Sequence, residues 1–340
     1  MTTSPSQREA PVSGASPTVA RSSAGFTLLE LVLVMGLIAI LSGIGIGFLR
    51  EADSGLDITR AILRDQIRIA YETARSTGRP TSVDLTKVDE IAFLRAKVLS
   101  PVGQWHLEPG ELPFGGLDPV LSGIEMATGR FGSCLRPDLA ENETMFRVAT
   151  SESPRFDLRD GFALRLEVFL EARERSIVAS LGETFSLELD EDLRPIARLT
   201  LADGPKAGRT VSLGSEEYVL PLRRWVSLEL VHDGVDFLLT VDGEEVSQAA
   251  AVGEPFQPTE GQWFEVSPSN SLVHGMIDEI QLLGYELTES LQIPADVEIL
   301  GLSTPVAYDR RGVLRRPVTI ELVLGTHREV RKVAPGGVLE

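Results

Sequence analysis

The stretch of sequence that decides the fold is GFTLLELVLVMGLIAILSGIGIGF, residues 25–48. From Phe26 to Phe48 a single side chain, that of Glu30, is charged. As a helix rising about 1.5 Å per residue, this segment is long enough to cross a hydrocarbon layer roughly 30 Å thick. The sequence therefore predicts a membrane-spanning helix over residues 26–48.

The leader before this segment, residues 1–25, is rich in Ser, Thr and Pro and carries two Arg against one Glu. Because these basic residues precede the apolar run, we expect the leader to stay in the cytoplasm and the rest of the chain to face outward. A cleaved secretory signal has a shorter apolar region and an A-x-A-like exit, which residues 42–48 lack. A plain single-pass anchor gives no reason for Glu30, whose unpaired charge would cost roughly 2.5 kcal/mol or more in the membrane.

Residues 25–30, GFTLLE, resemble the processing signal of type IV prepilins and type II secretion pseudopilins. The resemblance implies that a prepilin peptidase cleaves after Gly25 and methylates the new N-terminal amine of Phe26. It also implies that Glu30 pairs with the N-terminal amine of a neighbouring subunit during assembly. This pairing makes physical sense, since a buried carboxylate is tolerable only beside a cation.

A second helical segment follows the apolar run. Its apolar residues recur at helical spacing and line one face. They are Leu56, Leu63, Ile67, Ala70 and Ala74. Gly78 suits a left-handed cap at the end of the helix, and Pro80 cannot continue it. We therefore expect an amphipathic helix that packs on its own domain.

The sequence next predicts a β-rich head that is split by an insertion. Strands are expected over residues 81–85 and 91–99, whereas the Pro- and Gly-rich residues 100–124 are expected to be a connector. Downstream strands, with a turn at residues 309–312, are expected over residues 297–300, 306–308, 318–324 and 328–333. Their order looks like the closing strands of minor pseudopilins. We predict a pseudopilin-like head made of residues 49–124 and 290–340.

The middle segment, residues 125–289, has a pattern of its own. Apolar residues alternate over residues 162–170, which is typical of a half-buried strand, and Asp242-Gly243 favours a tight hairpin. In chain order, this segment resembles the laminin-G-like family of concanavalin-A-type domains at residues 129–132, 156–162, 225–231, 239–243 and 275–280. We predict a two-sheet sandwich with Trp225 in its core.

The predicted fold class is thus α+β. It combines a long N-terminal membrane-spanning helix, a small β-rich pseudopilin head and an all-β concanavalin-A-like sandwich.

Composition narrows the function. The chain has 340 residues with 32 Lys+Arg and 50 Asp+Glu, and residues 125–289 hold most of the excess acid, with 31 Asp+Glu against 14 Lys+Arg. No nucleic-acid partner is predicted, because phosphate binding needs clustered Lys and Arg. The one cysteine, Cys134, excludes an internal disulfide and multi-cysteine metal sites, and we expect it to be buried like a small apolar residue.

No cofactor is predicted, and the acidity is interpreted as a solvated surface. The alternative is calcium, which prefers carboxylate and carbonyl oxygens, and the densest acidic cluster is residues 190–192. For a second charged stretch, near the C-terminus, two interpretations stay open: it faces lipid headgroups or an acidic neighbouring subunit, or its residues are simply solvated on an exposed strand. Its basic residues are Arg310, Arg311, Arg315, Arg316, Arg328, Arg331 and Lys332.

No enzyme activity and no catalytic residue are predicted. A retaining glycosidase needs two carboxylates about 5–5.5 Å apart. The motif that begins at Glu188 has Leu193 where the second catalytic Glu would stand. Asp278 and Glu279 are adjacent, so their side chains are expected to point to opposite faces of a strand.

We therefore predict a pilin- or pseudopilin-like subunit that assembles into an envelope filament of a type II secretion or type IV pilus system. Its sandwich would be displayed to bind carbohydrate or a secreted protein. The expected partners are the prepilin peptidase, other pilin or pseudopilin subunits and the inner membrane, which the chain would cross once, with its C-terminal domains in the periplasm or on the cell surface. The alternative is a membrane-anchored binding protein that uses the prepilin pathway only for processing and never polymerises.

Overall fold

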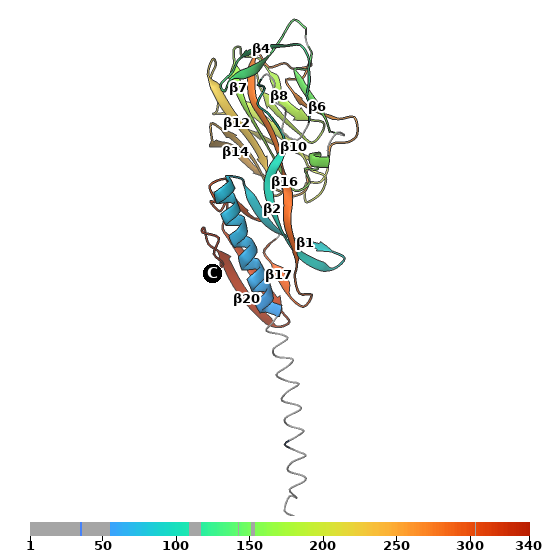
Figure 1. Cartoon of the computed structure of the whole chain (residues 1–340), viewed down its shortest axis with the longest axis vertical. Helices are drawn as coiled ribbons and strands as arrows, with labels where there is room; N and C mark the ends of the chain where they lie inside the picture. Colours follow the sequence, from blue (N-terminus) through green and yellow to red (C-terminus); the bar gives the residue numbers. More distant parts are fainter. Residues whose placement is uncertain (1–34, 36–54, 109–116, 142, 151–153, 303) are drawn as a thin grey trace, which may run out of the picture. The chain divides into compact units, whose positions relative to one another are not determined.

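The computed structural model of the chain describes residues 35, 55–108, 117–141, 143–150, 154–302 and 304–340. In this part the chain is mostly β-strand, with a helix over residues 55–77 and one short 3-10 helix, η2 (Pro154–Phe156) (Figure 1). The predicted leader and, apart from Met35, the predicted membrane span lie outside the described residues. None of the helices that the structure describes is both long and apolar enough to cross a membrane.

The largest sheet has ten antiparallel strands. Along its path these are β14 (Glu244–Ala250), β13 (Asp236–Val241), β12 (Trp225–His232), β7 (Phe162–Leu170), β16 (Gly275–Gln292), β2 (Ile91–Trp105), β1 (Thr81–Val88) and β18 (Val306–Tyr308). A hairpin of β4 (Ile124–Thr128) and β5 (Ser133–Pro137) joins it at β16.

A seven-stranded sheet supplies the second layer of the sandwich. Its strands, in order, are β11 (Thr210–Gly214), β10 (Pro195–Thr200), β9 (Phe185–Leu189), β8 (Ser176–Leu181), β15 (Trp263–Val266), β6 (Phe146–Ala149) and β3 (Val120–Leu121). A separate three-stranded sheet consists of β17 (Glu298–Leu300), β19 (Val318–Leu324) and β20 (His327–Val333). The four strands predicted downstream of residue 296 are therefore confirmed as β17 to β20.

The sandwich core lies between the two large sheets, as the sequence pattern predicted. In β7 the residues from Phe162 to Leu170 are buried at every second position, whereas Arg165, Glu167 and Phe169 between them are half-buried. The predicted hairpin is also confirmed, because Asp242 and Gly243 both have positive φ between β13 and β14. Alternation and turn chemistry together make a two-layer fold that buries one face of each sheet.

A second core belongs to the head. All five apolar residues of the predicted helix stripe are buried in it, with side chains from the three-stranded sheet that include Ile299, Ile320 and Val333. Figure 1 shows the helix (blue) against β17 and β20. The predicted amphipathic helix is confirmed, because burying one apolar face on the sheet stabilises it far more than its intrinsic propensity does.

Gly78 ends the helix as predicted. Its φ is +65°, and its N–H donates to the carbonyl of Ala74 at 3.0 Å. A Cβ at this position would meet no atom within 4 Å, so Gly78→Ala should lower the free energy of unfolding by about 1 kcal/mol through backbone strain alone. Urea unfolding measures this, with Gly336→Ala as the control, since that glycine has equal space and no left-handed φ. An equal loss in both variants would refute the cap.

The predicted connector over residues 100–124 is wrong at its start. Strand β2 continues to Trp105, and β3 and β4 follow. Pro101 and Gly103 are accommodated because the pairing of β2 with β16 slips between Leu282 and Leu283, which leaves Val102 as the extra residue of a bulge. A bulge lets a strand contain a proline and a glycine that would otherwise interrupt it.

As a result, β2 passes from one core into the other while it stays paired with β16. On β2, Leu94 and Ala96 belong to the head core, whereas Val102 and Trp105 belong to the sandwich core. A small apolar cluster that contains Leu99 lies between the two cores. The division of the domains at residues 124 and 290 stays a prediction.

The tryptophan at the centre of the sandwich is Trp105, and the prediction that Trp225 lies in the core is wrong. Trp225 is half-buried and stands next to Val226, which is in the core. Trp105 is buried against Phe146 and Phe264, with ring centroids 5.2 and 5.8 Å away. Since successive side chains of a strand alternate, only one of Trp225 and Val226 can face the core.

Candidate functional site

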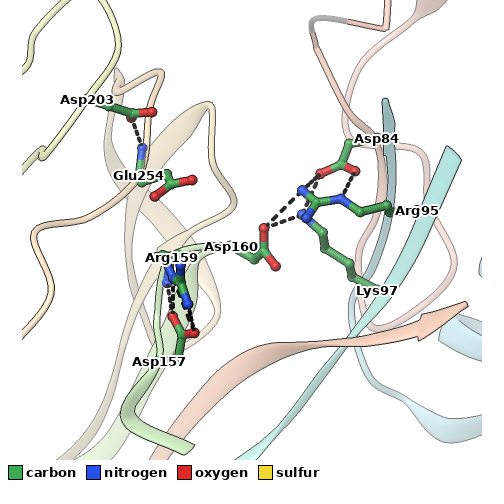
Figure 2. Close-up of polar contacts among 8 residues, drawn as sticks. All are labelled: Asp84, Arg95, Lys97, Asp157, Arg159, Asp160, Asp203 and Glu254. Carbon is green, nitrogen blue, oxygen red and sulfur yellow. Dashed lines mark hydrogen bonds and ion pairs between the residues drawn. The ribbon is translucent and has the colours of Figure 1, made fainter. Parts of the chain in front are cut away.

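The residues predicted for processing and assembly, Gly25, Phe26 and Glu30, lie outside the described residues. Within the described part, a polar groove of about 620 Å³ lies where the head meets the sandwich. We name it the junction groove, and its charged lining includes Arg95, Asp157, Arg159, Asp160 and Glu254. Figure 2 shows these side chains with the groups that they contact.

A buried lysine lies beside the junction groove. Lys97 of β2 is 4% exposed, and its ammonium donates to Asp84 of β1 and to Asp160 in the turn before β7 (Figure 2). The Nζ of Lys97 is 2.5 Å from Oδ1 of Asp160. A buried ammonium needs such partners, because an unpaired charge in a low-dielectric interior is strongly unfavourable. Lys97 thus connects the β1–β2 hairpin of the head to the sandwich.

Arg95 makes the same connection from the neighbouring position. It lies directly opposite Asp84 in the β1–β2 register, and its guanidinium donates to Asp84 at 3.1 Å and to Asp160 at 3.3 Å. Burial acts to lower the pKa of Arg95, but hydrogen bonding and charge from Asp84 outweigh it, so the pKa is raised. Arg95 therefore stays charged wherever the protein is folded.

Arg159 and Asp157 form an exposed ion pair at the rim of the groove. The guanidinium of Arg159 donates to both carboxylate oxygens of Asp157, with its Nε 2.9 Å from Oδ1. The hydrogen bonds from Arg159 lower the pKa of Asp157. Asp157 is thus an ionised acceptor that is already occupied.

Glu254 differs from the other carboxylates of the groove. Its pKa is raised, first by burial and then by the charge of Asp203, whose Oδ1 accepts a hydrogen bond from the backbone N–H of Glu254. The carboxylate of Glu254 has no hydrogen-bond or ion-pair partner among the described residues. A raised pKa suits a proton donor, but Asp157 and Asp160 are held by arginine and lysine. Of the carboxylates that line the groove, Asp157 and Asp160 are therefore occupied by basic side chains.

The acidic cluster at residues 190–192 is closed by its own chain. Oδ1 of Asp190 accepts hydrogen bonds from the backbone N–H groups of Asp192 and Arg194, at 2.9 and 2.8 Å. The Arg194 guanidinium also pairs with the Asp192 carboxylate at 2.7 Å. Across the described residues, no group of three or more His, Cys, Asp or Glu is arranged to hold a metal ion.

The two carboxylate motifs considered for catalysis are also paired. Burial acts to raise the pKa of Glu188, but hydrogen bonds from Arg198 and Ser186 reverse this, and the pKa is lowered. The carboxylate of Asp278 is fully buried, whereas that of Glu279 lies 2.7 Å from Nδ1 of His106. The two adjacent carboxylates thus have different environments.

Cys134 is fully buried, as predicted. Burial, assisted by the charge of Asp278, raises the pKa of its thiol to about 11. It therefore behaves as a small apolar side chain.

The basic C-terminal stretch pairs largely within the chain. Arg315 and Arg316 contact Asp233 and Asp236 at the β12–β13 turn, the first at 3.5 Å. Arg328 and Arg331 pair with Glu321 and Glu329 of their own hairpin. Four of the seven basic residues therefore form ion pairs within the chain, and their charges are neutralised without a lipid or a neighbouring subunit.

Sequence reasoning missed Lys97. A partial signal was present, because Lys97 lies between Ala96 and Val98 in a segment whose other basic residue, Arg95, stands on the same strand. Its partners Asp84 and Asp160 are distant in sequence, however, and no local pattern links them.

Comparison with known families identifies one segment. Residues 20–46 match the prokaryotic N-terminal methylation motif. The predicted prepilin-type resemblance is thus confirmed, and the motif indicates a prepilin-like subunit that is processed by prepilin peptidase and anchored in the membrane by its N-terminus. No curated protein matches the chain.

Two solved structures resemble parts of the chain. One is domain 4 of AbnA, a GH43 extracellular arabinanase from Geobacillus stearothermophilus, in complex with arabinotriose, at 14% identity over 56% of this chain and 95% of that one, with a TM-score of 0.39. The other is a heptameric SAP-like pentraxin from Limulus polyphemus, at 12% identity over 36% of this chain and 63% of that one, with a TM-score of 0.29. Both TM-scores are below 0.5, so neither match establishes the fold or the function of the chain.

Proposed function

We propose that the chain is a pilin- or pseudopilin-like subunit, cleaved after Gly25, methylated on Phe26 and assembled through Glu30 into an envelope filament. The filament would belong to a type II secretion or type IV pilus system. The observation that carries this proposal is the N-terminal methylation motif over residues 20–46. A chain with this role crosses the inner membrane once and presents its sandwich in the periplasm or on the cell surface to bind carbohydrate or a secreted protein.

The proposed role is mechanical and adhesive. It requires no catalysis, metal or cofactor, since the filament would position the subunit and the sandwich would contact its ligand. The closed arrangement of the charged groups supports it, because Asp157, Asp160 and Glu188 are held in ion pairs. The rival is an anchored binding protein that is processed in the same way but never polymerises.

Processing is tested by mass spectrometry of the membrane-extracted protein from cells with and without prepilin peptidase. The mature N-terminal peptide should start at methylated Phe26 and be absent without the peptidase. An intact leader, or a cut elsewhere, would reduce the first fifty residues to an ordinary anchor and overturn the proposal.

Assembly is tested by Glu30→Ala. We expect normal cleavage but strongly reduced incorporation into filaments, because the variant removes the only carboxylate of the apolar run. The measurement is the amount of protein in sheared filaments relative to the membrane fraction. Glu9→Ala is the matched control, since Glu9 lies in the leader that cleavage removes. Normal filament yield from the Glu30 variant would favour the non-polymerising rival.

A further inference from the structure

The outer face of the ten-stranded sheet carries a row of large apolar side chains. Register places Trp225 of β12 opposite Phe169 of β7, and Phe169 opposite Met276 of β16. All three side chains are half-buried, whereas their sequence neighbours Val226 and Val168 lie in the sandwich core. Because side chains alternate along a strand, the row points away from the core. The Trp225 and Phe169 rings are 5.5 Å apart and inclined at 51°.

A polar row lies next to this aromatic row. Ser227 faces Glu167 across β12 and β7, one position further along each strand face. Glu167 accepts a hydrogen bond from Arg130, which reaches it from the β4–β5 turn. The carboxylate of Glu167, which is two residues before Phe169 on β7, and the guanidinium of Arg130 thus lie on the same face of the sheet as the aromatic row.

A second arginine–carboxylate pair is built from other loops. Arg224 pairs with Asp242 of the β13–β14 turn. The other oxygen of Asp242 accepts a hydrogen bond from the backbone N–H of Ser227 at 3.0 Å, which fixes the carboxylate at Ser227, two residues after Trp225. Two self-neutralised pairs therefore flank the aromatic row.

A third aromatic ring is held in solvent near the first pair. Phe131, at the tip of the β4–β5 turn, is 55% exposed, and the Arg130 guanidinium lies 5.4 Å from its ring centroid. The backbone N–H groups of Arg130 and Phe131 donate to the buried carboxylate of Asp278, at 2.9 and 3.1 Å. A Cβ at Gly129 would come within 2.5 Å of that carboxylate. The turn is thus fixed by a buried carboxylate while it presents a largely exposed phenyl ring, one face of which lies against the Arg130 guanidinium.

We propose that these groups bind an uncharged sugar chain. The sugar face is defined by Phe131, Phe169, Trp225 and the Arg130–Glu167 and Arg224–Asp242 pairs. This inference rests on the proposed display of the sandwich and names its ligand class. A pyranose ring packs its C–H face on an aromatic ring, while its hydroxyls donate to carboxylates and accept from guanidinium groups.

The charges favour a neutral ligand over an acidic one. Each arginine of the sugar face is already neutralised by its carboxylate, so neither is free to attract an anion. The surrounding residues 125–289 carry 31 acidic against 14 basic side chains, which repel an acidic polymer at long range.

Packing alone does not account for the three rings. An aromatic pair such as Trp225 and Phe169 stabilises neighbouring strands, so that pair taken alone has a structural explanation. The Phe131 ring is not explained by strand packing, because Phe131 is 55% exposed and its turn is held by hydrogen bonds to Asp278. An exposed aromatic ring on a rigid turn is typical of a binding surface, where Phe and Trp are enriched.

The test is isothermal titration of the full-length protein in detergent with cellohexaose, xylohexaose, arabinohexaose and chitohexaose, and with hexagalacturonate as the acidic counterpart. We expect at least one neutral hexasaccharide to bind. Trp225→Ala and Phe131→Ala should each weaken that binding about tenfold or more, as truncation of a central aromatic contact does. Trp263→Ala is the matched control, because Trp263 is half-buried like Trp225 but lies on β15 of the seven-stranded sheet, and it should leave affinity unchanged.

Three outcomes would overturn the inference: no neutral oligosaccharide binds, only hexagalacturonate binds, or the affinity is unchanged in both aromatic variants. Phe131→Ala keeps the test decisive, because an exposed ring can be removed without unfolding the sandwich. Failure here is separable from failure of the proposed function. A protein with a methylated Phe26 that binds no neutral sugar would refute only the sugar face, and one that binds sugar with an intact leader would refute only the filament role.

Discussion

Lys97→Met is expected to lower the free energy of unfolding by about 3 kcal/mol, because removal of one partner from a buried ion pair leaves the others uncompensated. Asp84 and Asp160, which both accept hydrogen bonds from Lys97, would be left with Arg95 alone. The estimate is at the low end of the usual range, since Asp160 is itself 30% exposed. Urea unfolding followed by tryptophan fluorescence measures the change.

Arg68→Met is the matched control, since Arg68 is 61% exposed and its two carboxylate partners are 3.9 Å away. Its loss should cost less than about 0.5 kcal/mol, as is usual for surface pairs. In a double-mutant cycle, Lys97→Met and Asp160→Asn should couple by about 1 kcal/mol or more. Strict additivity would mean that Lys97 does not connect the head to the sandwich.

Trp105→Ala should destabilise the protein by about 3–5 kcal/mol, because it leaves a large cavity in the sandwich core. The variant removes ring contacts to Phe146 and Phe264 and leaves the carbonyl of Leu117, which accepts a hydrogen bond from Nε1 of Trp105 at 2.9 Å, without this donor. The unfolding midpoint in urea should fall accordingly, at an unchanged denaturant slope.

Trp263→Ala provides the comparison for this variant. Trp263 is half-buried and stacks with the guanidinium of Arg147 at 4.9 Å, so its truncation should cost less than half as much. An equal loss of stability in both variants would mean that Trp105 is not the central residue of the sandwich core.

Local patterns predicted much of the fold. The helix stripe from Leu56 to Ala74, the positive φ at Gly78 and the Asp242-Gly243 hairpin all follow from spacings of seven residues or fewer. The downstream strands β17 to β20 were predicted because each is a short run with β-branched or aromatic residues that lies next to turn residues. The processing motif was found in the same way, since residues 25–30 are contiguous.

The misses depend on contacts between distant residues. Pro101 and Gly103 indicated a connector, but a bulge in the pairing with β16 keeps the strand intact, and nothing near residue 101 encodes that bulge. Trp225 was placed in the core because a two-sheet sandwich commonly buries a tryptophan. The alternation of its strand, with Val226 and Leu228 on one face and Ser227 on the face of Trp225, indicates the opposite and is what the structure follows. The junction groove was not predicted, because Arg95, Arg159 and Glu254 come from separate segments that only the fold brings together.

The continuity of β2 and β16 determines how the protein responds to force. These two strands are paired with each other from Phe93 and Gln292 to Trp105 and Ile280, and β2 carries the chain from the head core into the sandwich core. A pull on the sandwich along the strands therefore runs through two covalent backbones into the head. There β2 is paired with all eight residues of β1, so its hydrogen bonds are loaded in shear and must break together.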